Sequence, residues 1–434
     1  MAAAMSVALL VALANAQDAA AQSPPPPATK ASEDANGHPL ASFHAGLAAL
    51  ERRRTSRLTI LQLGDSHTAG DMLSGRLRER LQRRFGNAGR GMLPPGEPFI
   101  YWRPHGHVVV QAGDWTVLSS HGAKPPPAAY GLSGFVLRGT TPVEEILVAS
   151  RDDKGTFDSV EVGYLTRPDG GRLDVLINGR RLRSLQTRAA GRTHIRRAIA
   201  LPRASRELAL VPHGDGPVDI TDWSLLRASP GIVVTSLGIP GAQIGVMSRW
   251  HWPSVERDIR HLAPRLLILA FGTNEGFGSL AGLAGYAWMF EQRLARLRRA
   301  APDMSVVVLG PPDANRLPSY CDAARAQADA RRCQPLTPEE MRDYDALIAA
   351  RNPRLCHWHT PPGLALVRRA QRQAAQRQGA LFIDWAELQG GPCGADAWTR
   401  SGLAAKDRVH LTREGYHRTA DHLLARILDG YPGR

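Results

Sequence analysis

An apolar run that stops at a serine constrains this chain more than any other feature. Residues 58–63 read as a short buried strand, and the chain then turns at Gly64-Asp65-Ser66-His67. Apolar residues at near-helical spacing from Met72 to Phe85 predict a helix after the turn. A strand that ends at glycine and hands over to a helix leaves Ser66 on an exposed turn, facing backbone amides that can stabilise negative charge.

Strand and helix patterns alternate through much of the chain. We expect a leading helix over 42–54, strands near 232–236, 265–270, 305–309 and 381–385, and helices near 280–300, 361–378 and 413–429. Alternation of this kind builds a parallel sheet that helices cover on both faces.

Between about residues 94 and 229 the pattern changes to short β-rich runs separated by Gly, Pro and Asp turns. Asn178-Gly179 is a strong signal for a tight hairpin. Several strands at short spacing predict a β sandwich or jelly roll. The expected fold class is therefore α/β: a three-layer α/β/α domain of residues 38–94 and 230–434, interrupted by an inserted β-rich domain of residues 95–229.

Three downstream blocks could meet Ser66. Gly241 follows the run 232–236, and Asn274 follows the run 266–269. Asp407 and His410 stand in a late loop ahead of the last amphipathic helix. Open parallel sheets place their ligands at the carboxyl ends of strands, where these blocks are expected.

Taken together, the four blocks resemble the SGNH or GDSL-type hydrolases across nearly the whole chain. The sequence departs from that family's pattern at Glu275, where aspartate is usual, but the functional group is the amide of Asn274. A closer resemblance is to the bacterial peptidoglycan O-acetylesterases. It rests on GDSHTAGD at 64–71, GNAGRG at 86–91, GIPGAQ at 238–243, WHTPP at 358–362 and GPCG at 391–394. It rests also on the long insertion, which in that subgroup is a small β domain like a carbohydrate-binding module.

The resemblance implies a role for each residue. Ser66 Oγ would attack an ester carbonyl, and His410 would take the hydroxyl proton and later return it to the leaving group. Asp407, three residues earlier in the same loop, could hold the second imidazole nitrogen. The amides of Ser66 and Gly241 and the side-chain amide of Asn274 would form the oxyanion hole.

The resemblance implies a serine esterase that needs no metal or cofactor, and we expect it to be exported. It would remove O-acetyl groups from peptidoglycan, at the muramic acid C6 hydroxyl, or from a related polysaccharide. The acyl-enzyme chemistry also permits a polysaccharide O-acetyltransferase. A non-catalytic glycan-binding protein is a third interpretation, based on the β-rich insertion and the basic charge.

The same residues have structural interpretations. Asp407 and His410 could be a helix cap and a surface histidine, and Asn274 could satisfy its own backbone in a turn. Gly241 could serve a turn as well as the oxyanion. Asp65 is expected to brace the turn beside Ser66.

Other residues near these blocks are expected to be structural. His67 should point away from the reaction. Five aromatic residues of the insertion could stack on sugars, but a sandwich of this size needs aromatic packing: Tyr101, Trp102, Trp115, Tyr130 and Trp223. Two pairs of histidines at i, i+2 spacing lack a neighbouring set of metal ligands: His105 with His107, and His357 with His359.

The first residues resemble a secretory leader. Residues 1–16 hold a short apolar stretch and end in Ala14-Asn15-Ala16, like a cleavage site, although a basic n-region is missing. A small buried helix is the alternative. Residues 17–37, with four consecutive prolines, read as a flexible linker. No later apolar run is long enough to span a membrane.

Four cysteines, an even number in an exported chain, suggest two disulfides and leave three pairings open. Cys321–Cys333 would close a short polar loop and is the preferred pair, which leaves Cys356–Cys393. Four buried free thiols are the alternative.

The formal charge of +14 is carried almost wholly by arginine. A basic surface would attract an anionic polymer such as peptidoglycan, which fits the periplasm of a Gram-negative bacterium. We find no nucleic-acid recognition motif and expect no nucleic-acid partner. The charge could also reflect arginines spread over solvated faces.

Overall fold

The computed structural model describes residues 37–122, 129–322 and 331–433. The predicted leader of residues 1–16 and the predicted linker, apart from Gly37, lie outside these residues. None of the described helices is both long and apolar enough to cross a membrane.

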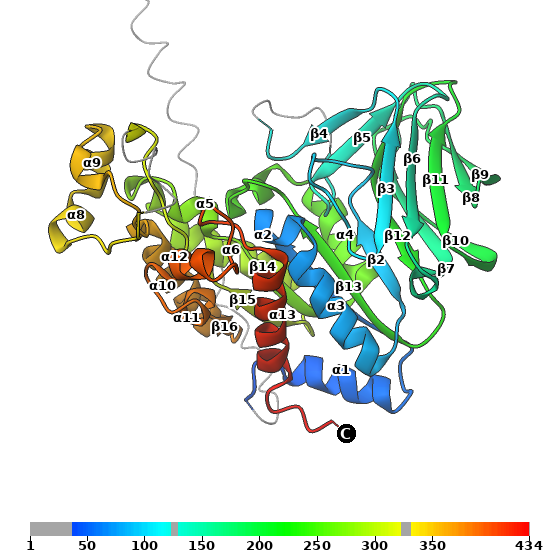
Figure 1. The fold of residues 1–434 in the computed structure, drawn as a ribbon. Coiled ribbons are helices and arrows are strands. Elements are labelled where there is room, and N and C mark those ends of the chain that lie inside the picture. Colours follow the sequence, from blue (N-terminus) through cyan, green and yellow to red (C-terminus); the bar gives the residue numbers. More distant parts are fainter. Residues whose placement is uncertain (1–36, 123–128, 323–330, 434) are drawn as a thin grey trace, which may run out of the picture. The chain divides into compact units, whose positions relative to one another are not determined.

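A five-stranded sheet, sheet A, forms the centre of the α/β domain (Figure 1), and its strand order is β13-β1-β14-β15-β16. Every neighbouring pair in it is parallel. Nearly all of its residues are buried, which explains the continuous apolar runs in the sequence. Its strands are β1 (Arg57–Gly64), β13 (Gly231–Gly238), β14 (Pro264–Ala270), β15 (Ser305–Leu309) and β16 (Leu381–Ile383).

Helices cover both faces of sheet A, and alternate residues of its strands join two separate apolar cores. One face packs against α1 (Ala41–Glu51), α3 (Met72–Phe85) and α13 (Arg413–Leu428). The other packs against α4 (Trp252–Leu262), α6 (Tyr286–Ala300) and α10 (Pro362–Arg377). The predicted three-layer α/β/α arrangement is confirmed.

Short helices fill the connections. The α-helices among them are α2 (Ser66–Ala69), α5 (Thr273–Gly276), α8 (Pro338–Arg342), α9 (Tyr344–Ala349), α11 (Trp385–Leu388) and α12 (Gly394–Arg400). The 3-10 helices are η1 (Asp153–Gly155), η2 (Ile244–Arg249), η3 (Ala281–Leu283) and η4 (Pro353–Leu355).

Two antiparallel sheets lie between α3 and β13 in the sequence, drawn in cyan and green in Figure 1. Sheet B has the order β10-β7-β12-β5-β4, with β2 also paired to β12, and sheet C has the order β3-β6-β11-β8-β9. Side chains from both sheets share one apolar core, so the two sheets form a sandwich.

The strands of the sandwich are β2 (Gly89–Leu93), β3 (His107–Ala112), β4 (Thr116–Ser119), β5 (Phe135–Gly139), β6 (Glu145–Ser150), β7 (Phe157–Leu165), β8 (Arg172–Ile177), β9 (Arg180–Gln186), β10 (His194–Ser205), β11 (Glu207–Pro212) and β12 (Val218–Leu226). Asn178 and Gly179 join β8 to β9 with φ angles of +47° and +74°, as a tight hairpin requires.

We call residues 89–226 the β insertion. Strand β2 begins before residue 95, where the sequence predicts the boundary, and pairs with β12 of sheet B. The amide of Met92 in β2 also donates to Thr235 Oγ1 of β13, at 3.1 Å. Strand β2 therefore links the sandwich to the edge of sheet A, and the domain boundaries stay a prediction.

The helix predicted from Met72 to Phe85 is α3, and Asp71, with a left-handed φ of +52°, separates it from the short α2 that begins at Ser66. Its buried carboxylate pairs with Arg78 and Arg90, each at 2.9 Å, and accepts the amide of His105 at 2.8 Å. Despite burial, these two arginines hold the pKa of Asp71 well below its usual range. The carboxylate thus joins α3, β2 and the loop of the β insertion around His105, which we call the 105 loop.

The predicted disulfide pairing is wrong. The bonds are Cys321–Cys356 and Cys333–Cys393, with Cα atoms 5.3 and 5.5 Å apart. Both distances lie within the range that a disulfide spans.

The cause is a segment that folds back along its own chain. Residues 356–360 run beside two earlier stretches, through the bridges Arg316–His359 and Cys333–Trp358. Cys356 is thereby placed against Cys321, while Cys333 is left to face Cys393. Closeness in sequence therefore did not decide the pairing.

We expect peptide mapping under non-reducing conditions to recover Cys321 linked to Cys356 and Cys333 linked to Cys393. The loops closed span 35 and 60 residues. The loop-entropy description assigns about 4 kcal/mol of stability to each. Reduction should therefore lower the melting temperature. Recovery of either other pairing, or thiol labelling of the native protein, would contradict the assignment.

Candidate active site

Three neighbouring strands of sheet A end in register. Gly64 of β1 pairs with Gly238 of β13 on one side and with Ala270 of β14 on the other. Because all three strands are parallel, the chain leaves them at one edge of the sheet. The stretches that carry Ser66, Gly241 and Asn274 begin at this edge.

Glycine at position 64 is required by a close approach. A Cβ there would lie 2.5 Å from the carbonyl oxygen of Ala270 and 2.2 Å from Thr68 Oγ1. Asp65 caps α2 by accepting the amide of His67 at 3.0 Å, and so braces the turn as predicted. Burial raises the pKa of Asp65 to about 6.

Ser66, His410 and Asp407 form a hydrogen-bonded series, although 344 positions separate the first two. His410 Nε2 lies 3.0 Å from Ser66 Oγ, and His410 Nδ1 lies 2.7 Å from Asp407 Oδ2. The other carboxylate oxygen, Oδ1, accepts the amides of Val409 and His410 at 2.9 and 3.0 Å. One oxygen of Asp407 thus shapes the loop, and the other orients the imidazole.

Charge and hydrogen bonding couple the two loop residues. The hydrogen bond to Asp407 raises the pKa of His410, although partial burial opposes the shift. Burial would raise the pKa of Asp407, but hydrogen bonds from His410 and the loop amides lower it to about 2. Asp407 therefore stays ionised and holds the proton on Nδ1, which leaves Nε2 to accept the proton of Ser66.

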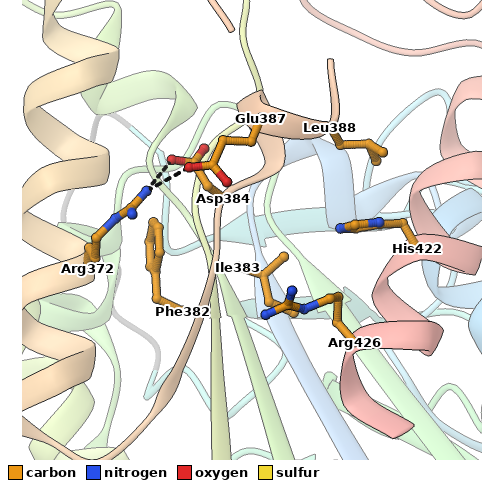
Figure 2. Close-up of a pocket in the computed structure, with 8 residues that line it drawn as sticks. All are labelled: Arg372, Phe382, Ile383, Asp384, Glu387, Leu388, His422 and Arg426. Atoms are coloured by element: carbon orange, nitrogen blue, oxygen red, sulfur yellow. Dashed lines mark hydrogen bonds and ion pairs between the residues drawn. The ribbon is translucent and has the colours of Figure 1, made fainter. Parts of the chain in front are cut away.

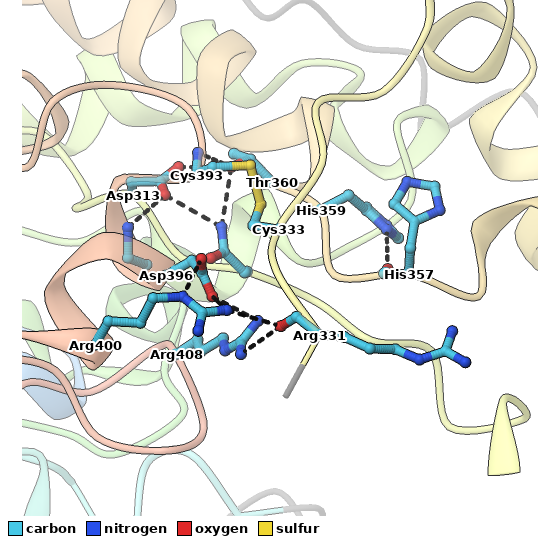
Figure 3. The surroundings of a disulfide bond; sticks show 12 residues. Asp313, Arg331, Cys333, His357, His359, Thr360, Cys393, Asp396, Arg400 and Arg408 are labelled. Atoms are coloured by element: carbon cyan, nitrogen blue, oxygen red, sulfur yellow. Dashed lines mark hydrogen bonds and ion pairs between the residues drawn. A yellow bond between two sulfur atoms is a disulfide. The ribbon is translucent and has the colours of Figure 1, made fainter. Parts of the chain in front are cut away.

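Arg408 anchors the loop that carries Asp407 and His410 (Figure 3). Its guanidinium pairs with Asp396 at 2.8 Å. The same group lies 4.3 Å above the ring of Trp358. Its carbonyl accepts the amide of Asn315 at 2.9 Å. The sequence reasoning missed this residue, since an arginine in a polar loop carries no signal of burial.

The Cys333–Cys393 disulfide lies beside this anchor (Figure 3). Arg408 also donates to the carbonyl of Arg331 at 2.9 Å, two residues before Cys333. Cys393 donates its amide to Thr360 Oγ1 at 3.0 Å. The disulfide therefore connects the segment of Arg331, which contacts Arg408, to the segment of Cys393.

The candidate oxyanion donors Gly241 and Asn274 follow two neighbouring strands. Asn274 Nδ2 donates to the carbonyl of Ala242 at 3.0 Å, which orients its amide. An amide nitrogen carries two hydrogens, so a second bond can go to a substrate oxygen. Gly241 has a φ of +73°, which favours glycine there.

Glu275, the departure from the family pattern, has a structural contact of its own. Its buried carboxylate accepts the amide of Ile244 at 2.7 Å, at the start of η2. Burial, together with the charge of Asp65, raises its pKa to about 7. The side chain therefore joins the stretch after β13 to the stretch after β14.

His67 is a buried packing partner of His410, with ring centroids 5.4 Å apart. Its Nδ1 lies 3.0 Å from the hydroxyl of Tyr416. Burial lowers its pKa to about 3, so the ring is neutral. The sequence predicts that His67 points away from the reaction. Its ring instead packs against the imidazole of His410.

Four of the five aromatic residues singled out in the insertion are buried, as a packing role requires: Trp102, Trp115, Tyr130 and Trp223. The fifth, Tyr101, is 46% exposed.

Among the described residues, one group of three could offer metal ligands: His194, Asp222 and Asp258, with ligand atoms within 4.8 Å of one another. Arg196 already donates to Asp222 at 2.6 Å and to Asp258 at 3.1 Å. The guanidinium thus takes the place that a cation would fill, and the group joins α4 to β10 and β12.

A cavity of about 510 Å³ lies between α10, β16, α11 and α13 (Figure 2). Arg372 crosses it to reach Asp384 and Glu387, at 2.7 and 3.2 Å. None of Ser66, Asp407 and His410 lines this cavity. It therefore does not belong to the candidate site.

Part of the chain matches a known protein family. Residues 214–418 match the model of the GDSL-like Lipase/Acylhydrolase family. The match contains Gly241, Asn274, Asp407 and His410, whereas Ser66 stands upstream, beyond the β insertion. A search of curated proteins gave no match.

Among solved structures, a peptidoglycan O-acetylesterase is similar with a TM-score of 0.69 and 24% identity, over 90% of this chain and 96% of that one. An active-site mutant of a family two carbohydrate esterase from Clostridium thermocellum scores 0.30 at 10% identity, over 74% of this chain and 98% of that one. A salicylyl-acyltransferase from a tetracycline biosynthetic pathway scores 0.30 at 14% identity, over 80% of this chain and 100% of that one. The two lower scores establish no shared fold. Residues 214–418 therefore match a GDSL-like lipase and acylhydrolase domain, the chain has a fold similar to that of a peptidoglycan O-acetylesterase, and these two findings support a serine esterase.

Proposed function

We propose that this protein is an exported esterase that removes O-acetyl groups from peptidoglycan, at the muramic acid C6 hydroxyl. The observation that carries the proposal is the hydrogen-bonded series of Ser66, His410 and Asp407, on a fold shared with a peptidoglycan O-acetylesterase. Two disulfides fit an oxidising compartment, such as a bacterial periplasm.

The reaction begins when Ser66 Oγ attacks the acetyl carbonyl carbon and its proton passes to His410 Nε2. Asp407 stabilises the imidazolium that forms. The carbonyl oxygen becomes an oxyanion, which the amides of Ser66 and Gly241 and the Asn274 side chain stabilise. One such donor commonly contributes about 3 kcal/mol to lowering the barrier.

The sugar oxygen then leaves with the proton from His410, and the acetyl group remains on Ser66. Water replaces the glycan, gives a proton to His410 and attacks the acetyl carbon. Acetate leaves as the proton returns to Ser66 Oγ. An added glycan hydroxyl could take the place of water, so transfer is an outcome to be tested.

The exposure of the site suits a polymeric substrate. The side chains of His410 and Asp407 are 44% and 50% exposed. A bulky glycan can approach such an open site without a deep pocket. The formal net charge of +14 would favour a polymer whose peptide stems carry carboxylates.

Ser66→Ala and His410→Ala should each lower kcat/KM for an aryl acetate by roughly 10³-fold or more, because one removes the nucleophile and the other its base. The rate of phenol release measures the loss, and an unchanged melting temperature shows that each variant is folded. A folded variant with a near-normal rate would remove the assigned role.

The pH profile should depend on Asp407. His410 must be neutral to accept the proton of Ser66. Because its pKa is raised from the ordinary value of 6.5, the ring stays protonated to a higher pH than a free histidine would. We therefore expect kcat/KM to rise with pH, with a midpoint above 6.5. Asp407→Asn removes the charge that raises the pKa, so the midpoint should fall and the plateau should drop by roughly 10²- to 10⁴-fold. An unmoved midpoint would contradict the pairing.

The substrate is tested by acetate release from O-acetylated peptidoglycan, acetylated xylan and acetylated alginate. We expect peptidoglycan to be the best substrate and Ser66→Ala to release no acetate from it. Faster release from xylan or alginate would overturn the proposed substrate. Appearance of newly acetylated glycan when an acceptor is added would instead favour a transferase.

A further inference from the structure

We propose that Tyr101 and His121, both in the β insertion, bind the glycan part of the ester substrate beside Ser66. The inference rests on the proposed function, and it assigns to the insertion a direct part in substrate recognition.

Tyr101 is an exposed aromatic residue supported by the core of the insertion. Its ring lies 5.0 Å from that of Phe99, which in turn lies 5.6 Å from Trp102 and 6.0 Å from Phe135. Trp102 and Phe135 are buried, while Tyr101 is 46% exposed. The tyrosine is thus held in place on one side and presents its other side to solvent.

The segment that carries Tyr101 is fixed next to the turn at Ser66. The amide of His105 donates to Asp71, between α2 and α3, at 2.8 Å. Asp71 stands five residues after Ser66, and His105 stands four residues after Tyr101. The hydrogen bond between Asp71 and His105 therefore holds the segment of Tyr101 close to the Ser66 turn.

His121 lies beside Gly241, one of the candidate oxyanion donors. Its Nε2 is 3.1 Å from where a Cβ on Gly241 would stand. Arg249, at the end of η2, donates to the carbonyls of Ser120, at 3.0 Å, and Gly122. The backbone on both sides of His121 is thereby held to the stretch that follows Gly241, while the residue itself is exposed.

Two insertion residues thus approach the site at different points, Tyr101 on the segment held to Asp71 and His121 beside Gly241. A sugar ring offers an apolar C–H face and several hydroxyls. A tyrosine ring packs on such a face, and an imidazole exchanges hydrogen bonds with hydroxyls. An aryl acetate lacks these groups, so the two side chains should matter for glycan esters alone.

The test compares two substrates in the full-length protein. Tyr101→Ala and His121→Ala should each lower kcat/KM for O-acetylated peptidoglycan about tenfold, and change that for 4-nitrophenyl acetate by less than about twofold. Tyr101→Phe keeps the ring and should retain most of the glycan activity. Val143→Ala and Leu182→Ala, at exposed sites elsewhere in the insertion, should change neither rate.

An equal fall on both substrates, or an unchanged rate on the glycan, would overturn the inference. If the wild-type protein hydrolyses acetylated xylan rather than peptidoglycan, the proposed substrate fails, and the same variants are then compared on xylan, with the same expected tenfold fall. If the wild-type protein cleaves 4-nitrophenyl acetate but no glycan ester, both proposals are wrong.

Discussion

The reaction centre depends on the parallel register of three neighbouring strands. Gly64 stands level with Gly238 and Ala270, so the stretches with Ser66, the turn after β13 and the turn after β14 leave sheet A together. Strands β1 and β13 are neighbours in sheet A but lie far apart in sequence, because the β insertion stands between them. A shift of one residue in this register would turn every buried side chain of β1 to the opposite face, so both cores of the α/β domain maintain it.

Buried charges attach the β insertion to this framework at two places. Asp71 joins α3 to β2 and the 105 loop, and Arg196 joins β10 to Asp222 of β12 and Asp258 of α4. Removing one partner of a buried pair typically costs about 3–5 kcal/mol, because the other charge is left uncompensated. Such contacts hold the insertion in one orientation, which the proposed roles of Tyr101 and His121 require.

The loop of His410 is held by a second set of contacts. Asp407 shapes its turn from within, while Arg408 reaches outward to Asp396 and Trp358. The Cys333–Cys393 disulfide lies next to these contacts, because Arg408 also donates to the carbonyl of Arg331, two residues before Cys333. An open site can therefore keep its catalytic geometry, since the ordering comes from contacts behind the loop and not from a covering pocket.

The sequence alone determined the periodicity of the strands and helices and the α/β class with its β interruption. It also singled out Ser66, Asp407 and His410, whose side chains lie within hydrogen-bonding distance of one another. These depend on local patterns, which the chain carries at each position. The tertiary structure alone decided the pairing of Cys321 with Cys356, the anchoring of Arg408 and the exposure of Tyr101 among buried aromatics. Each of these depends on which distant segments come to lie side by side, and local spacing does not specify that.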